Sequence, residues 1–172
     1  AIVGQIQQAN EKAHKLADLA IHGNQSLKQS GPHSLNDFIR QYIDAGFAIE
    51  GLKYELVQDN RAFDCKFDSS SIGIIIDNIA SNSVKAGATI LQISLEERGK
   101  YVEIAFSDNG IGLAENINRQ SLFEWGFSSN RKKKGYGIGL YHIKQLVDEM
   151  NGTVEIDTTY RRGFKLIVRL KK

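Results

Sequence analysis

Two glycine-rich runs and the polar stretch between them constrain this chain more than any other feature. The first run, Asp108-Asn109-Gly110-Ile111-Gly112, closes an alternating apolar segment that is typical of a β-strand. The second run, Gly135 to Leu140, precedes a helical pattern, and backbone amides at a helix start suit an anion such as phosphate. Glycines at both places let the backbone turn sharply and approach a ligand. Residues 113–134 are too polar for a core and predict a functional loop such as a lid.

Composition limits the class of protein to which these runs can belong. With 172 residues and 41% apolar side chains, the chain has the length of one ordinary domain plus an appendage. A net charge of +2 is too small to predict nucleic acid or an anionic membrane as the main partner. The single cysteine, Cys65, excludes an internal disulfide and favours a reducing, cytoplasmic compartment. No apolar run reaches the length of about 18 residues that a membrane span needs, so we expect no membrane span in this chain.

The N-terminal region has a helical pattern of its own. Its apolar side chains recur at steps of three and four, at Ile2, Ile6, Ala9, Ala13, Leu16 and Ala20. This pattern fits equally an amphipathic helix packed on its own domain and the end of a dimerising coiled coil. The Gly31-Pro32 pair predicts a linker, so we expect a helix with its linker over residues 1–33 and a domain over residues 34–172. Because Met150 is the only methionine, we expect the chain to be a piece of a longer protein.

Helical and strand patterns alternate in the first half of the domain. Ser34 is a candidate N-cap for a helix that continues to about Ala48. Short strands are expected at Lys53 to Val57 and at Ala62 to Phe67, around a turn at residues 58–60. Asp68 to Ser70 offers caps for a third helix, whose expected buried residues are Ile72, Ile75, Ile76, Ile79 and Val84.

The second half of the domain carries clearer alternation. Thr89 to Glu97 and Lys100 to Ser107 predict a β-hairpin with one apolar face. A helix is expected after the second glycine run and should end at Asn151-Gly152, and residues 154–158 and 164–170 predict a last hairpin. Strands packed on helices in this arrangement predict an α+β sandwich of two layers.

Polar side chains near the glycine runs suit a bound cation and a purine. Asn78 and Asn82 lie four residues apart on one helical face, where two amide oxygens can aim at one hard cation, and Lys85 lies on nearly the same face. A lone Asp-x-Gly usually only opens a turn. This set of motifs, however, resembles that of the ATP-binding GHKL superfamily, and the resemblance implies that Asp108 is a buried carboxylate that accepts a hydrogen bond from the exocyclic amine of adenine. Residues 131–134 are basic, and Lys134 is the best candidate partner for phosphate oxygens.

In their order and spacing these segments resemble the GHKL superfamily of ATP-binding domains, which includes gyrases, heat-shock chaperones, histidine kinases and mismatch-repair proteins. The resemblance covers roughly residues 34–170. Four segments carry the resemblance: Asn78 to Lys85 resembles the N box, Asp108 to Gly112 the G1 box, Leu122 to Phe127 the F box and Gly135 to Leu140 the G2 box. It implies a Bergerat-type fold, in which helices cover one face of a mixed β-sheet, and it implies ATP and Mg²⁺ as cofactors.

The resemblance also implies roles for single residues. Asn82 is the implied magnesium ligand, Asn78 supports it, and Lys85 faces the phosphates or the nucleotide, so these three form the implied catalytic set. The implied ATP-binding residues are Asn82, Lys85, Asp108, Gly110, Ile111, Gly112, Phe123, Lys134, Gly135, Tyr136, Gly137, Ile138, Gly139 and Leu140. The loop also contains the aromatic residues Phe123, Trp125 and Phe127. A simple anchoring role and a direct part in catalysis fit them equally well.

Position 78 separates the branches of the superfamily. Members that hydrolyse ATP resemble one another in carrying a glutamate there as general base, whereas the amide of Asn78 cannot take a proton from water. The chain is therefore similar to the sensor histidine kinases, and Gly126 to Ser129 resembles the lid of citrate and dicarboxylate sensors. Two features depart from the family pattern: Asp77 precedes the asparagine, and Gly163-Phe164 stands where many kinases have Gly-Thr.

The resulting prediction is a protein histidine kinase, represented by its ATP-binding catalytic domain in two-component signal transduction. None of the four histidines has the sequence context of a phosphoacceptor. The acceptor histidine is therefore expected on another domain of the same chain or on a partner chain, with a response regulator downstream and a possible homodimer formed through the N-terminal helix. The alternative is a nucleotide-gated conformational switch of the gyrase, chaperone or mismatch-repair type. A degenerate nucleotide-binding or scaffolding module is less favoured.

Overall fold

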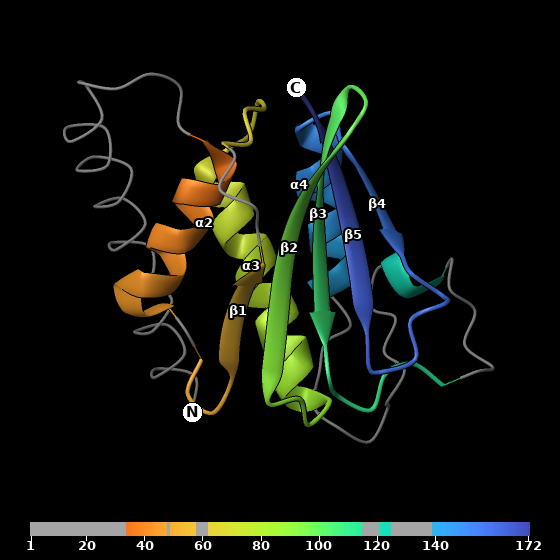
Figure 1. Ribbon diagram of the computed structural model, residues 1–172. Helices are drawn as coiled ribbons and strands as arrows, with labels where there is room; N and C mark the ends of the chain where they lie inside the picture. Colours follow the sequence, from red (N-terminus) through yellow and green to blue (C-terminus); the bar gives the residue numbers. More distant parts are fainter. Residues whose placement is uncertain (1–33, 48, 58–61, 115–120, 125–138) are drawn as a thin grey trace, which may run out of the picture.

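In the part of the chain that the structure describes, the central element is a mixed β-sheet of five strands. The computed structural model describes residues 34–47, 49–57, 62–114, 121–124 and 139–172. The strands stand in the order β1-β2-β3-β5-β4 (Figure 1). Their bounds are β1 Lys53–Val57, β2 Ile90–Arg98, β3 Tyr101–Asp108, β4 Thr153–Ile156 and β5 Lys165–Lys171. Only the β1–β2 pair is parallel among these described strands, and the three other pairs are antiparallel.

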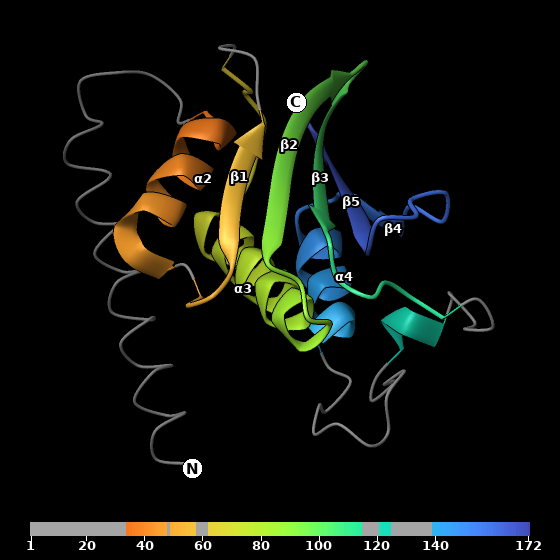
Figure 2. The same cartoon turned by 60° about the horizontal axis from the view of Figure 1, so that its bottom comes forward.

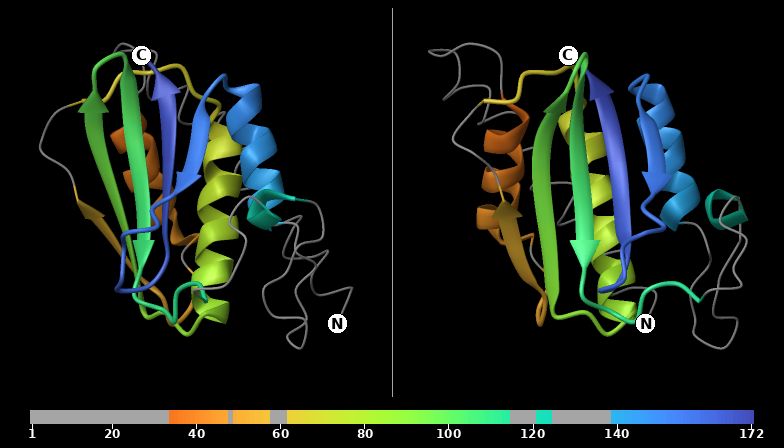
Figure 3. Two further views of the ribbon diagram at one scale, coloured as in Figure 1. Left: turned by 90° about the vertical axis from the view of Figure 1, so that its right-hand side faces the viewer. Right: turned by 45° about the vertical axis from the view of Figure 1, so that its right-hand side comes forward.

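Helices form the second layer. Seen side-on, α3 (Ser69–Lys85) and α4 (Gly139–Glu149) lie on one face of the sheet (Figure 3). α2 (Leu35–Tyr42) follows Ser34 and passes into a π-helical turn at Ile43–Phe47, so the helix expected to reach Ala48 is α-helical only in its first part. The prediction of an α+β sandwich with a mixed sheet is confirmed.

The long helix α3 shows how the local sequence sets an element. Its N-cap is Asp68, whose carboxylate accepts a hydrogen bond from the backbone N–H of Ser71 at 2.7 Å. The expected isoleucines are buried, and each stabilises the fold by roughly 1.5–3 kcal/mol at most. Val84 was expected among them but is 39% exposed. The helical period explains the error, because the buried stripe continues from Ile79 to Ser83.

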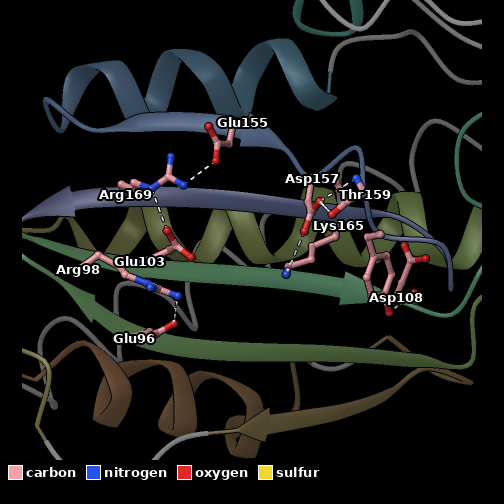
Figure 4. Close-up of polar contacts among 10 residues, drawn as sticks. Glu96, Arg98, Glu103, Asp108, Glu155, Asp157, Thr159, Lys165 and Arg169 are labelled. Atoms are coloured by element: carbon pink, nitrogen blue, oxygen red, sulfur yellow. Dashed lines mark hydrogen bonds and ion pairs between the residues drawn. The ribbon is translucent and has the colours of Figure 1, made fainter.

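The β2–β3 hairpin follows its alternating sequence. Ile93 lies opposite Phe106 and Leu95 lies opposite Ile104 across the two strands. These four side chains are buried against the helices together with Leu91 and Val102. The opposite face of the sheet carries charged side chains. There Arg169 on β5 lies between Glu103 and Glu155 and donates to both carboxylates (Figure 4). The predicted hairpin is confirmed.

The strand predicted at Ala62 to Phe67 is wrong. Residues 62–68 form an extended connection with no ladder of their own. Phe63 is fully buried, its N–H donates to Oδ1 of Asn36 at 3.1 Å, and its carbonyl accepts from the N–H of Leu35 at 3.0 Å. The alternating apolar residues therefore anchor the segment to α2 and the core instead of pairing with a strand. β1 instead pairs in parallel with β2.

The C-terminal elements agree with the sequence apart from their ends. α4 ends before Asn151, which adopts a positive φ of 55°, and the N–H of Gly152 donates to the carbonyl of Val147 at 2.9 Å. Thr158 and Phe164, expected in the last hairpin, lie outside β4 and β5. None of the helices in the described ranges is long and apolar enough to cross a bilayer.

Several expectations fall on residues that the structure does not describe. These are the N-terminal helix and linker over residues 1–33, the turn at residues 58–60, and most of the loop between the glycine runs, including Trp125, Phe127 and Lys134. Most of the second glycine run, at Gly135, Tyr136, Gly137 and Ile138, also lies outside the described residues.

Candidate functional site

The two asparagines of α3 meet the start of α4. The side chain of Asn78 donates from Nδ2 to the carbonyl of Ile74 at 2.9 Å, which leaves its Oδ1 for other partners. A Cβ added to Gly139 would lie 3.3 Å from Oδ1 of Asn78 and 3.3 Å from Nδ2 of Asn82. Figure 2 shows the start of α4 beside the second half of α3. The fold thus brings Asn78, Asn82 and the end of the second glycine run together.

The carboxylate of Asp108 lies at the end of β3 and is 3% exposed. Its Oδ1 accepts from the N–H groups of Gly110 at 2.9 Å and Phe164 at 3.0 Å, and its Oδ2 accepts from the hydroxyl of Ser83 at 2.8 Å. Its carbonyl accepts from the hydroxyl of Tyr160 at 3.3 Å. The side chain is therefore fixed by groups from α3, from its own loop and from the β5 end of the sheet.

The loop after Asp108 is held by hydrogen bonds to the start of β2 and to the residue that follows α3. Asn109 accepts from the N–H groups of Thr89 and Ile90 at 2.9 and 3.0 Å and donates to the hydroxyl of Thr89. The N–H of Ile111 donates to the carbonyl of Ala86 at 3.1 Å. These bonds hold the N box and the G1 box in one fixed arrangement.

Glycine is needed in this loop because two backbones touch. Gly112 has a φ of 67°, and a Cβ there would lie 2.7 Å from the carbonyl oxygen of Gly163. Gly110 has no more room, since a Cβ would lie 2.9 Å from the Cβ of Ala86. The segment between β4 and β5 therefore forms a wall of the same site.

Thr159 stabilises the start of that segment. Its hydroxyl and its N–H both donate to the carboxylate of Asp157, at 2.7 and 2.9 Å, and they lower the pKa of Asp157 to about 2 with help from Lys165. Figure 4 shows these three residues at the same end of the sheet as Asp108.

A family model described as "Histidine kinase-, DNA gyrase B-, and HSP90-like ATPase" matches residues 67–172. This chain belongs to that family. The match contains α3, the β2–β3 hairpin, α4 and the last two strands, which are the elements that build the site.

Sensor kinases are among the curated relatives of this chain. A probable C4-dicarboxylate sensor kinase from Bacillus subtilis (strain 168) is 30% identical over 112 residues, which is 60% of this chain and 21% of that protein. The sensor-type histidine kinase PrrB from Mycobacterium tuberculosis (strain ATCC 25618 / H37Rv) is 34% identical over 103 residues, which is 59% of this chain and 23% of that protein. The chain thus spans about a fifth of the length of these curated relatives.

Solved structures show the same fold. The ATP binding domain of PrrB from Mycobacterium tuberculosis has a TM-score of 0.63 at 28% identity, over 82% of this chain and 96% of that chain. The mycobacterial sensor histidine kinase MprB has a TM-score of 0.67 at 22% identity, over 82% of this chain and 97% of that chain. The predicted resemblance to the catalytic domain of sensor histidine kinases is confirmed, and it is favoured over the gyrase or chaperone alternative.

Asp77, the acidic neighbour of Asn78, belongs to a different environment from the family motifs. It lies against Tyr42 of α2, where burial raises the pKa of the tyrosine well above its usual range and the charge and hydrogen bond of Asp77 raise it further. The pKa of Tyr54 on β1 is also raised, first by burial and further by the charge of Asp77. Asp77 thus joins α3 to α2 and β1, about 100° around the helix from Asn78.

The other expected site residues lie around this centre. Lys85 is exposed at the last turn of α3, and Ile111 is 85% exposed in the loop after Asp108. Phe123, in a short 3-10 turn at Ser121–Phe123, and Leu140 both pack against the hydrophobic core. For these two residues the structure favours an anchoring contact.

The donor set near Gly139 fits magnesium. The described ranges contain no cluster of three or more His, Cys, Asp or Glu side chains that could hold a metal. Mg²⁺, however, commonly keeps its waters and binds through few protein oxygens plus substrate phosphates. The oxygens of Asn78 and Asn82 at the start of α4 suit that mode.

Sequence reasoning missed four residues of the site. Three of them, Ser83, Tyr160 and Phe164, donate hydrogen bonds to Asp108. The fourth is Gly163, where an added Cβ would collide with Asp108. Gly163-Phe164 carried a signal, because it departs from the family pattern at that place. Ser83 lies within the N box, but it carried no signal of its own, since a serine within a helix is compatible with many surroundings.

Proposed function

We propose that this domain binds MgATP and donates the γ-phosphoryl group to a histidine on another domain. The observation that carries the proposal is the convergence of Asn78, Asn82 and Gly139, because it joins a candidate metal site to a helix N-terminus. The fixed carboxylate of Asp108 also supports the proposal, because it binds Ser83 in the last part of the N box and so adds a second polar group to the site.

The base end of the proposed site is Asp108. Its hydrogen bonds fix the carboxylate before any ligand arrives, so little ordering is lost on binding. A carboxylate is an acceptor, and the 6-amino group of adenine is a donor. A purine without that amine would leave the remaining acceptor place of the buried carboxylate unfilled, which disfavours its binding.

The phosphate end of the proposed site is the start of α4. Backbone N–H groups at a helix N-terminus attract phosphate oxygens, and Lys85 and Lys134 are the cations proposed to assist them. Asn82, supported by Asn78, would hold Mg²⁺, which would neutralise phosphate charge and orient the γ-phosphoryl group. Gly110, Ile111, Gly112 and the second glycine run, Gly135 to Gly139, complete the proposed nucleotide contacts.

The reaction type follows from position 78. Asn78 cannot deprotonate water, and Asp77 is occupied by the contact with Tyr42 of α2. In the proposed transfer, a lone pair on an imidazole nitrogen attacks the γ-phosphorus and the bond to the bridging oxygen breaks, which leaves ADP. The acceptor domain, the response regulator that takes the phosphoryl group onward, a dimer formed through residues 1–33 and a cytoplasmic location belong to the same proposal.

Phosphoryl transfer tests the proposal directly. The chain is mixed with the histidine-containing dimerisation domain of its parent protein and with γ-labelled ATP. The expected product is an acid-labile, base-stable phosphohistidine, formed while the chain alone releases negligible phosphate. Gly139→Ala should slow the transfer, because the added methyl group would contact the amides of Asn78 and Asn82. Asn78→Glu should not create a fast ATPase, since a base contributes only about 10²–10⁴-fold and needs a positioned water.

Steady phosphate release by the chain without any acceptor would contradict the proposal. That result would place the domain with the nucleotide-gated switches of the same family.

A further inference from the structure

The two oxygens of the Asp108 carboxylate are bound in different ways. Oδ1 accepts two backbone N–H groups, whereas Oδ2 accepts one hydroxyl, that of Ser83 at 2.8 Å. Ser83 is 1% exposed and lies on α3, 25 residues before Asp108. A helix and a strand end are thus joined by one buried hydrogen bond between side chains.

This arrangement fixes which hydrogen-bonding groups remain. A carboxylate oxygen accepts about two hydrogen bonds, so Oδ1 is filled and Oδ2 keeps one place. The hydroxyl of Ser83 has one proton, which it donates to Oδ2, so its oxygen can only accept a further bond. The pair therefore offers only acceptors to a ligand.

We propose that Ser83 is a positioning residue that sets the choice of nucleobase at this site. Its hydroxyl holds Oδ2 in the orientation that accepts from a 6-amino purine, and because its one proton is donated to Oδ2 it offers no donor to a 6-oxo purine. This inference rests on the proposed binding of an adenine nucleotide at Asp108 and adds the group that keeps the carboxylate selective.

Loss of the hydroxyl should loosen the selectivity without removing the site. The terminal torsion of aspartate is broad, so a carboxylate held only through Oδ1 can turn away from the ligand. Hydrogen bonds to charged groups are among the stronger ones in proteins, so losing the bond from Ser83 to the carboxylate should weaken the binding of a 6-amino purine measurably.

Calorimetry with two nucleotides tests the inference. ATP is compared with purine riboside triphosphate, which lacks the 6-amino group, in wild type, Ser83→Ala and Ser83→Thr. We expect Ser83→Ala to bind ATP about tenfold more weakly and the analogue unchanged. Ser83→Thr keeps a hydroxyl and is expected to restore much of the preference. Ser81→Ala is the matched control, because Ser81 lies on the same helix about 200° away from Ser83.

The other outcomes would overturn the inference. An equal loss for both nucleotides would make Ser83 structural, and no loss for ATP would make its hydroxyl irrelevant to the base. A wild type that binds both nucleotides equally well, or neither of them, would instead refute base recognition by Asp108, which is a failure of the proposed function itself.

Discussion

The two ends of the β2–β3 hairpin use glycine for opposite purposes. At the tip, Gly99 has a φ of 61° and a Cβ there would meet nothing within 4 Å. At the other end, an added Cβ would meet backbone atoms at Gly110, Gly112 and Gly163. The tip needs glycine only for its backbone conformation, whereas the end that carries Asp108 needs it so that separate chain segments can touch.

Polar groups differ between these ends in the same way. Near the tip, Arg98 and Glu96 form an ion pair of 2.8 Å between exposed side chains, which contributes little to stability. At the site end, Asn109 and Asp108 bind backbone groups of neighbouring segments. The difference teaches that close backbone packing, more than the strand pattern itself, marks the functional end of this sheet.

The largest effect is expected when Gly163→Ala, at the site end, is compared with Gly99→Ala, at the tip of the hairpin. At position 163 the Cβ would lie 2.7 Å from Oδ1 and 2.8 Å from the carbonyl carbon of Asp108, where a rigid backbone must move. We expect a loss of about 3 kcal/mol in the free energy of unfolding. Gly99→Ala suffers only the left-handed backbone conformation and should lose about 1 kcal/mol. Urea unfolding of both variants measures the difference, and equal losses would contradict the contrast between the two ends.

A smaller effect is expected from Asp108→Asn, measured as affinity for MgATP. The amide can keep its oxygen toward the N–H groups of Gly110 and Phe164, and its NH2 then takes the place of Oδ2. There the NH2 can donate to the hydroxyl of Ser83, but it offers no acceptor to the 6-amino group of adenine, so a donor faces a donor at the base. The expected loss is about 2 kcal/mol. Glu103→Gln is the matched control, since Glu103 lies on the same strand and pairs with Arg169 on the far face. Calorimetry showing equal affinity for Asp108→Asn and wild type would remove Asp108 from the site.

The smallest effect separates a metal role from a structural one at Asn82. Asn82→Ala removes a hard oxygen near Gly139, so nucleotide binding should weaken by about 1 kcal/mol more in Mg²⁺ than in EDTA. The same protein titrated under both conditions provides its own control. An identical loss in Mg²⁺ and EDTA would mean that the side chain only supports the packing of α3 on α4.

Local patterns in the sequence determined most of the framework. The alternation of Leu91, Ile93 and Leu95 predicted the hairpin, Asp68 predicted the start of α3, and Asn151-Gly152 predicted the end of α4. The spacing of Asn78 and Asn82 placed both amides on one helical face. These features were readable because a strand repeats every two residues and a helix every 3.6, so a short segment carries the information.

Tertiary structure alone decided the contacts between distant segments. The sequence did not show that β1 would pair in parallel with β2, that Phe63 would anchor a connection instead of a strand, or that Asp77 would contact Tyr42. It also did not show that Ser83 and Phe164, 25 and 56 residues from Asp108, would bind the same carboxylate. Periodicity specifies which face of an element is buried, but the partner on that face depends on the path of the whole chain.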